Sequence, residues 1–358
     1  MTQARPRHFA NLLLSFASSI APSHTPAFTD EDGQVYPESV ATMETAVVGG
    51  VPQWFWFRGS SRDNPALVLL HGGPGGSLGA LFRRYNAELE RHFLVVTWEQ
   101  RGAGRSYQRG ISSASMTVAQ FVHDLGEVVE LVKTRFHQSK VIFLAHSWGT
   151  ILGTLYAHRH PENVAAYVGV GQIADMPKGE QLSYDFALSE AVRSGNRKAI
   201  AALGRIGPPP HTLSAMLTER RWVSHFGGNI YTTPTATELV LEALQADEFN
   251  LLDLIKLFQG SQFSTKYLWP EMSRINFTET NLSFEVPVLF LLGRHDRVVP
   301  CALAAAYLGQ ISAPYKKIVW FEHSAHNPNY EEPEKFNRVV LEELLSVAKS
   351  VNTGERLE

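Results

Sequence analysis

The sequence predicts an α/β fold, in which a mostly parallel central sheet is flanked by helices and a helical insertion separates two of its strands. Three observations predict it. Short apolar segments alternate with amphipathic ones, as in parallel sheets covered by helices. One long interval shows helical patterns and no convincing strand. The composition, with 44% hydrophobic and 19% charged residues, is that of an ordinary globular protein.

The expected strands are short, almost continuously apolar and rich in β-branched residues, which suits strands buried on both faces. They are Ala66–Leu70, Phe93–Thr97, Val141–Leu144, Ala166–Val170, Val286–Leu292 and Lys317–Phe321. Two further segments, Val118–Lys133 and Glu331–Ala348, place apolar residues at helical spacing. This alternation indicates a parallel sheet.

The segment Thr45–Arg58 precedes these strands and has a different pattern. Its residues alternate in polarity around the pair Gly49-Gly50, which favours two antiparallel strands joined by a tight turn. We therefore expect a hairpin that leads into the sheet.

The interval without strands runs from about Gln172 to Phe284, is rich in aromatic residues and contains Gly207-Pro208-Pro209-Pro210. Both of its flanks lead into expected strands. Residues 172–284 are therefore predicted to form a helical lid, inserted into a core domain made of residues 1–171 and 285–358. A separate domain is the less favoured alternative.

Charge and cysteine content narrow the range of expected partners. The net charge is −3 and no run of Lys or Arg occurs, so neither a nucleic-acid surface nor electrostatic recruitment to a membrane is expected. Cys301 is the single cysteine and cannot form an internal disulfide. Because no activating motif surrounds it, we expect a packed loop residue rather than a catalytic thiol.

The N-terminus allows two interpretations. Arg5 and Arg7 precede the apolar stretch Leu12–Ile20, which loosely resembles a signal peptide. The stretch is short and interrupted by serines, so we favour an amphipathic helix packed on the body of a cytoplasmic protein. No segment is long enough to span a bilayer.

The strongest local motif is Val141–Gly153, in which an apolar strand leads directly into Ser147 and a helical pattern follows. A sharp turn from strand to helix lifts a serine hydroxyl clear of the sheet, where it can act as a nucleophile. The small residues Ala145 and Gly149 flank the serine two positions away on either side, although Gly is more usual at the first of these. We predict that Ser147 is the nucleophile.

A second serine, Ser77, matches the pattern G-x-S-x-G letter for letter. It is separated from the strand Ala66–Leu70 by a Gly/Pro-rich loop, so it cannot stand at a tight turn from strand to helix. We therefore reject Ser77 as the nucleophile.

That loop, His71–Gly76, has a predicted role of its own. Acyl transfer creates an oxyanion, which backbone N–H groups must already face. A glycine-rich loop after a strand lets the backbone approach the reacting carbonyl closely. We predict that the N–H groups of Gly73 and Trp148 form the oxyanion hole; a purely structural glycine turn is the alternative.

Three motifs together, HGGPGG, WEQRGAGRS and HSWG, resemble the proline iminopeptidase-like branch of the α/β-hydrolase superfamily. That branch typically has D-Q-R-G-x-G-R-S and G-G-S-W-G, so Glu99 and the pair Ala145-His146 are departures from it. The resemblance covers about Thr45–Gly171 and Val286–Ala348, and does not extend into the predicted lid. It implies an α/β-hydrolase fold and serine hydrolase activity.

The two partners of Ser147 are expected after the lid. Asp296 follows the strand-like Val286–Leu292 on a loop, where an acid can orient a base. Two histidines compete for the role of base, and His326 is preferred because it lies farther into its loop, whereas His323 stands at the strand exit. The order Ser, Asp, His along the chain is that of α/β-hydrolases.

No metal or organic cofactor is expected, because serine chemistry needs neither. The remaining histidines, such as His146, His158 and His160, lack metal-ligand spacing and are interpreted as surface or core residues.

The substrate depends on the lid. Its aromatic residues suit a bulky, mostly apolar ester or lactone, and the family resemblance extends to esterases that act on macrocyclic lactones; ester or lactone hydrolysis is the first hypothesis. Proline iminopeptidase activity is the second, since the lid also offers carboxylates for a peptide's ammonium group: Glu180, Glu190, Glu219, Glu238 and Glu242. A non-catalytic small-molecule receptor on the same fold is the alternative of another class. The expected partners are thus a small-molecule ester, a lactone or a short peptide.

Overall fold

The computed structural model describes residues 23–77 and 79–353. It contains one eight-stranded sheet of order β1-β2-β4-β3-β5-β6-β7-β8. The strands are β1 (Val40–Val48), β2 (Val51–Gly59), β3 (Ala66–Leu70), β4 (Leu94–Glu99), β5 (Val141–His146), β6 (Val164–Val170), β7 (Val288–Gly293) and β8 (Lys316–Phe321). The first three strands of this order pair antiparallel and all other pairs are parallel, so the predicted mostly parallel sheet is confirmed.

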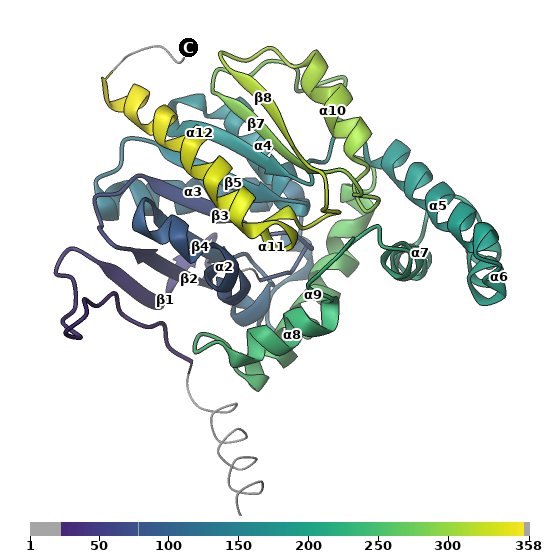
Figure 1. Ribbon diagram of the computed structural model, residues 1–358, viewed down its shortest axis with the longest axis horizontal. Coiled ribbons are helices and arrows are strands. Elements are labelled where there is room, and N and C mark those ends of the chain that lie inside the picture. Colours follow the sequence, from purple (N-terminus) through teal and green to yellow (C-terminus); the bar gives the residue numbers. More distant parts are fainter. Residues whose placement is uncertain (1–22, 78, 354–358) are drawn as a thin grey trace, which may run out of the picture.

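Helices cover both faces of the sheet (Figure 1). One core cluster joins the sheet to α3 (Val118–Phe136), α4 (Trp148–Arg159) and α10 (Cys301–Gln310). The second joins the opposite face to α2 (Gly79–Asn86) and α12 (Pro333–Thr353). The strands between these layers are apolar throughout because both of their faces are buried, as β3 and β6 show in every residue.

The expected elements are found with small changes at their ends. The hairpin turns at Gly49 and Gly50, which both adopt positive φ. The C-terminal helix begins later than expected: a short helix α11 (Pro328–Glu331) ends before it, because Pro333 opens a new first turn. Cys301 is buried as expected, but it begins helix α10 rather than lying in a loop.

Residues 172–284 connect β6 to β7 and contain five helices within the described residues. They are α5 (Met176–Arg193), α6 (Arg197–Ile206), α7 (Leu213–His225), α8 (Ala236–Gln245) and α9 (Leu251–Met272). We call these residues the insertion. In Figure 1 its α5, α6 and α7 extend beyond the sheet on one side, whereas α8 and α9 lie along the sheet domain.

Helix α9 packs directly on the glycine-rich loops that follow β3 and β4. A Cβ atom at Gly260 would lie 2.6 Å from the carbonyl oxygen of Gly102, and one at Gly75 would lie 2.7 Å from the Cα of Ser261. Ser264 adds a hydrogen bond of 2.9 Å to the Gly102 carbonyl. The helix and these loops are therefore in backbone contact without room for a side chain.

The start of α9 is attached to the core by a buried ion pair. Arg105, in the short 3₁₀ turn Gly104–Ser106, donates from Nε and Nη2 to the two oxygens of Asp253 at 2.8 and 2.7 Å. Asp253 also accepts the N–H of Asn250 and so caps the helix.

Within the described residues, no helix is both long and apolar enough to cross a membrane. The N-terminal stretch Leu12–Ile20, for which two interpretations were given, lies outside those residues.

Candidate active site

Ser147 stands at the turn between β5, which ends at His146, and α4, which begins at Trp148. Its backbone has φ 52° and ψ −119°, a conformation that is costly for a residue with a side chain. Close packing leaves the turn no alternative: a Cβ atom at Gly149 would lie 2.1 Å from the Leu70 carbonyl oxygen. The predicted sharp turn is therefore present, with Ser147 at its apex.

His326 and Asp296 come from the loops after β8 and β7 and meet beside this turn. His326 Nδ1 donates to Asp296 Oδ2 at 2.7 Å, and both side chains are buried. The other carboxylate oxygen accepts the N–H groups of Val298 and Val299, each at 2.9 Å. These bonds hold the carboxylate still, so the imidazole is fixed with Nδ1 protonated and Nε2 available for proton transfer.

One cavity of about 280 Å³ brings the predicted residues together. Ser147, His326, Gly73 and Trp148 all line it, and Asp296 lies behind His326. The insertion supplies much of the remaining wall, most of it apolar: Met176, Met216, Leu217, Arg220, Ser261, Thr265, Trp269 and Met272. The site is thus formed jointly by sheet loops and insertion helices.

A buried network fixes the loop that carries Gly73. His71 Nδ1 donates to the Gly72 carbonyl at 2.8 Å, and its Nε2 accepts the N–H of Gln100 at 3.1 Å. Gln100 in turn accepts the indole N–H of Trp148 at 2.8 Å. Burial lowers the pKa of His71 to about 4, so its ring is neutral at pH 7, as this pattern of one donor and one acceptor requires.

His146 lies at the candidate site, whereas its sequence pattern predicts a surface or core histidine. Its Nε2 donates to the backbone carbonyl of His326 at 2.9 Å, and it lines the cavity. Burial, together with the neighbouring His326, lowers the pKa of His146 to about 3, so it bridges the loops as a neutral ring. The signal available in the sequence was the pair Ala145-His146, which stands where the family usually has Gly-Gly.

The two alternative candidates, His323 and Ser77, lie elsewhere. His323 is exposed, and its carbonyl oxygen accepts the hydroxyl of Thr232. Ser77 lies in a loop and donates to Glu99 Oε1 at 2.7 Å. Glu99 also accepts the N–H of Arg105 at 2.6 Å, so it organises the loop after β4 in place of the usual Asp.

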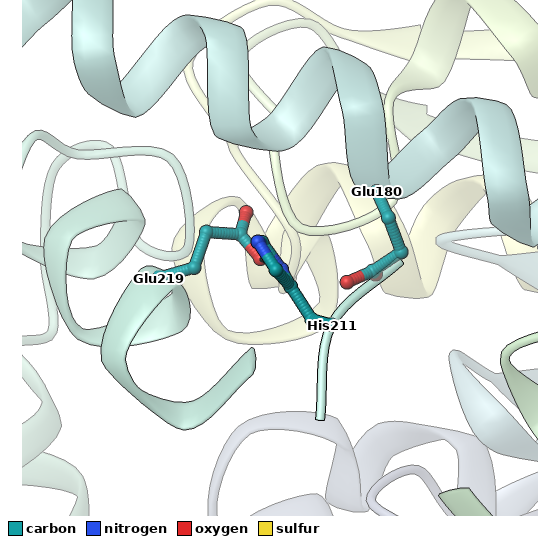
Figure 2. Close-up of side chains that lie close together, drawn as sticks. All are labelled: Glu180, His211 and Glu219. Atoms are coloured by element: carbon teal, nitrogen blue, oxygen red, sulfur yellow. Dashed lines mark ion pairs between the residues drawn. The ribbon is translucent and has the colours of Figure 1, made fainter. Parts of the chain in front are cut away.

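Two carboxylates of the insertion meet next to the cavity. Glu180 on α5 and Glu219 on α7 both contact the guanidinium of Arg220, with 2.9 Å from Arg220 Nη1 to each oxygen of Glu219. Both acids lie beside His211, and Figure 2 shows the two carboxylates on either side of its ring. The other acids considered in the sequence lie apart: Glu190 pairs with Arg193, Glu238 caps α8 and Glu242 contacts Tyr85.

The charges of this cluster depend on one another. Burial raises the pKa of Glu219 although Arg220 opposes the shift. Burial also disfavours the charge of Arg220, but Glu180 and Glu219 outweigh it and raise the pKa of the guanidinium. With both acids ionised, two carboxylates face one guanidinium, so the group has a net charge of −1. Neither Arg220 nor His211 was singled out from the sequence, because the residues converge from separate segments.

Residues 62–333 match the family described as serine aminopeptidase, S33. The chain is 32% identical to a probable aminopeptidase, YbaC, of Bacillus subtilis (strain 168), over 84% of this chain and 95% of that protein. The fold is similar to the crystal structure of a proline iminopeptidase from Mycobacterium smegmatis, with TM-score 0.64, 18% identity and coverage of 87% and 100% of the two chains. It is also similar to an esterase, RhEst1, from Rhodococcus sp. ECU1013, with TM-score 0.60, 20% identity and coverage of 85% and 99%.

The eight-stranded sheet, the turn at Ser147 and the family match agree with one another. The resemblance seen in the sequence motifs is confirmed, and with it the prediction of an enzyme. The chain belongs to the serine aminopeptidase (S33) family and is a proline iminopeptidase-like serine hydrolase of the α/β-hydrolase fold.

Proposed function

We propose that this protein is an aminopeptidase that removes the N-terminal residue of short peptides, with Ser147, Asp296 and His326 as its catalytic triad. One observation carries the choice of substrate: the buried carboxylates of Glu180 and Glu219 stand beside the cavity of Ser147, and their partner Arg220 lines it. A net negative group in a site of low polarity attracts a substrate ammonium.

In this mechanism His326 Nε2 takes the proton of the Ser147 hydroxyl while the serine oxygen attacks the carbonyl carbon. Asp296 stabilises the imidazolium through the 2.7 Å bond to Nδ1. The N–H groups of Gly73 and Trp148 stabilise the oxyanion. His326 then protonates the leaving amine, and a water molecule activated by the same imidazole releases the acyl group.

In this proposal the insertion acts as a lid that selects the N-terminal residue by its size and polarity. The cavity of about 280 Å³ is walled by methionines and Trp269, which suits an apolar side chain of moderate size. Methionine side chains adapt to different shapes, so we expect a preference for apolar N-terminal residues rather than strict selection of one. The relatives support the same class, since one is a probable aminopeptidase and another a proline iminopeptidase.

The second candidate is hydrolysis of a bulky ester or lactone. The apolar cavity wall favours it, and a structural relative is an esterase. This activity needs the same triad but no ammonium-binding group. It is the second candidate because it gives the carboxylates of Glu180 and Glu219 no role.

The test compares substrates that differ only in the ammonium group. Prolyl, leucyl and alanyl p-nitroanilides, their N-acetyl forms and a p-nitrophenyl ester series are given to the wild-type protein and to Ser147→Ala. We expect cleavage of the free-amine anilides, at least about 100-fold slower cleavage of the acetylated ones, and no activity in Ser147→Ala.

Fast ester hydrolysis without anilide cleavage would replace the aminopeptidase with the second candidate. Inertness toward every substrate would contradict both. Activity that survives in Ser147→Ala would mean that the nucleophile is another residue.

A further inference from the structure

The cluster of Glu180, His211 and Glu219 contains acceptor atoms to which its cation, Arg220, donates no hydrogen bond. Arg220 contacts one oxygen of Glu180 and both oxygens of Glu219. Among the described residues, Glu180 Oε2 and His211 Nδ1 have no hydrogen-bond partner, although both side chains are buried. Such groups are costly to bury unless a donor or a cation meets them.

The tautomer of His211 is fixed by its other nitrogen. Nε2 lies 3.0 Å from the Gly207 carbonyl oxygen, which can only accept, so Nε2 carries a proton. In the neutral ring Nδ1 then carries a lone pair, and it lies 3.7 Å from Glu219 Oε2. A second proton on Nδ1 would not make a hydrogen bond over that distance. The ring is held as histidines that bind metals are held, by a bond from the opposite nitrogen to a carbonyl.

The three side chains are spaced for one small cation (Figure 2). One ligand atom from each lies within 4.8 Å of the others. Ligands of a tetrahedral zinc ion lie about 3.3 Å apart at the usual bond lengths, so the side chains need to close by about 1.5 Å at most. One imidazole nitrogen with two carboxylate oxygens is a ligand set for Zn²⁺, whereas Mg²⁺ and Ca²⁺ prefer oxygen alone.

An ion can reach this cluster from outside. Glu180 and His211 line a second cavity, of about 610 Å³, together with Pro177, Pro209 and Trp269. Trp269 also lines the cavity of Ser147, so this side chain forms part of the wall of both cavities. Because the proposed function assigns the substrate ammonium to Glu180 and Glu219, a cation bound at the cluster would take its place.

We propose that Glu180, His211 and Glu219 form a binding site for Zn²⁺, and that the bound ion inhibits by competing with the substrate ammonium. The binding site is independent of the catalytic activity, whereas the competition rests on the proposed function. With both carboxylates ionised, the two acids and the one guanidinium have a net charge of −1, which a divalent cation reverses, so the ammonium is repelled when the ion is bound.

Binding is measured first, by isothermal titration of metal-free Ser147→Ala protein with ZnCl₂, so that catalysis plays no part. We expect one ion per chain, and at least about tenfold weaker binding in His211→Gln and in Glu180→Gln. His225→Gln is the matched control, because His225 is an exposed histidine of the same helix that carries Glu219. Circular dichroism and thermal unfolding establish that each variant is folded.

Inhibition is measured second, on the wild-type enzyme. Zn²⁺ is expected to raise KM for a free-amine anilide without lowering kcat, and to leave hydrolysis of a p-nitrophenyl ester unchanged. His211→Gln should lose this inhibition.

The outcomes separate the two proposals. Absence of stoichiometric binding, or binding unchanged in both His211→Gln and Glu180→Gln, overturns the zinc site whatever the enzyme cleaves. Binding that depends on these residues, in a protein that cleaves no anilide, supports the site and contradicts the aminopeptidase. Zinc inhibition of anilide and ester alike overturns the competition with the ammonium.

Discussion

At the scale of single residues, the geometry of the proposed triad depends on a glycine outside it. Gly171 follows β6 with φ 56°, and a Cβ atom there would lie 2.7 Å from His326 Cε1 and 2.8 Å from its Nδ1. A methyl group at this position must displace the imidazole from Asp296. Displacements of about 1 Å cost up to about 100-fold in rate at catalytic groups.

We therefore predict that Gly171→Ala lowers kcat by about 100-fold while the protein remains folded. Gly195→Ala is the control, because Gly195 has a similar φ of 65° but no neighbouring atom within 4 Å of the position that a Cβ would take. Both variants carry the strain of a left-handed alanine, about 1 kcal/mol, but only the first touches the triad. Steady-state kinetics and thermal unfolding of both variants check this; equal kcat values would contradict it.

At the scale of elements, helix α9 is held to the sheet domain by the buried pair of Arg105 and Asp253. Removing one partner leaves the other charge buried and unpaired, which costs about 3–5 kcal/mol. The unpaired charge would lie at the start of α9, where Asp253 also caps the helix.

We predict that Asp253→Asn lowers the stability of the protein by about 3 kcal/mol and exposes the residues around 246–253 to proteases. The control is Glu322→Gln, which breaks the exposed pair with Arg294 and should leave the stability nearly unchanged, because water screens that pair. Urea unfolding and limited proteolysis measure the two effects. An Asp253→Asn protein as stable and protease-resistant as Glu322→Gln would show that the pair does not hold the helix.

At the scale of the whole molecule, two neutral histidines, the buried His71 and the partly buried His146, make stability depend on pH. Burial lowers the pKa of His71 to about 4 and that of His146 to about 3, against the ordinary histidine value of 6.5 that applies to the unfolded chain. Between these values the unfolded chain binds more protons than the folded protein, so stability is lost as the pH falls below 6.5.

We predict that the free energy of unfolding decreases between pH 7 and pH 4 by about 3 kcal/mol for each of these histidines. His146→Gln should be less stable at pH 7 but should show a correspondingly smaller decrease toward pH 4. Exposed His225→Gln provides the comparison. Urea titrations across this pH range give the values, and identical pH slopes in all three proteins would contradict the prediction.

The sheet and the predicted site residues could be anticipated because their signals are local. Val141–Gly153 contains both the buried strand and the glycine that the turn at Ser147 requires, and strand-end positions located Asp296 and His326. In the structure His326 contacts Asp296, and the choice of His326 over His323 as the base stays a prediction. Their catalytic roles remain proposals.

The sequence predicts the bounds and the helical character of the insertion, but not how its helices pack together. All of its acids occupy similar positions in amphipathic helical patterns, so the sequence does not show which are buried. The packing of α5 against α7 buries Glu180 and Glu219, whereas acids such as Glu190 are solvated. His211 follows Gly207-Pro208-Pro209-Pro210 in an irregular segment, where no periodicity indicates its direction. Contacts between distant segments are not encoded in any local pattern.

The close packing of α9 on the glycine loops has a consequence for how substrates arrive. Gly260 and Ser261 leave no space between this helix and the loops of Gly75 and Gly102, so α9 cannot move away without displacing the loop His71–Gly76. We therefore expect α9 to move together with the loops that carry Gly73 and Gly102. For the proposed function, we expect substrates to enter and leave past α5 to α7, and the opening rate of these helices to limit the turnover of large substrates.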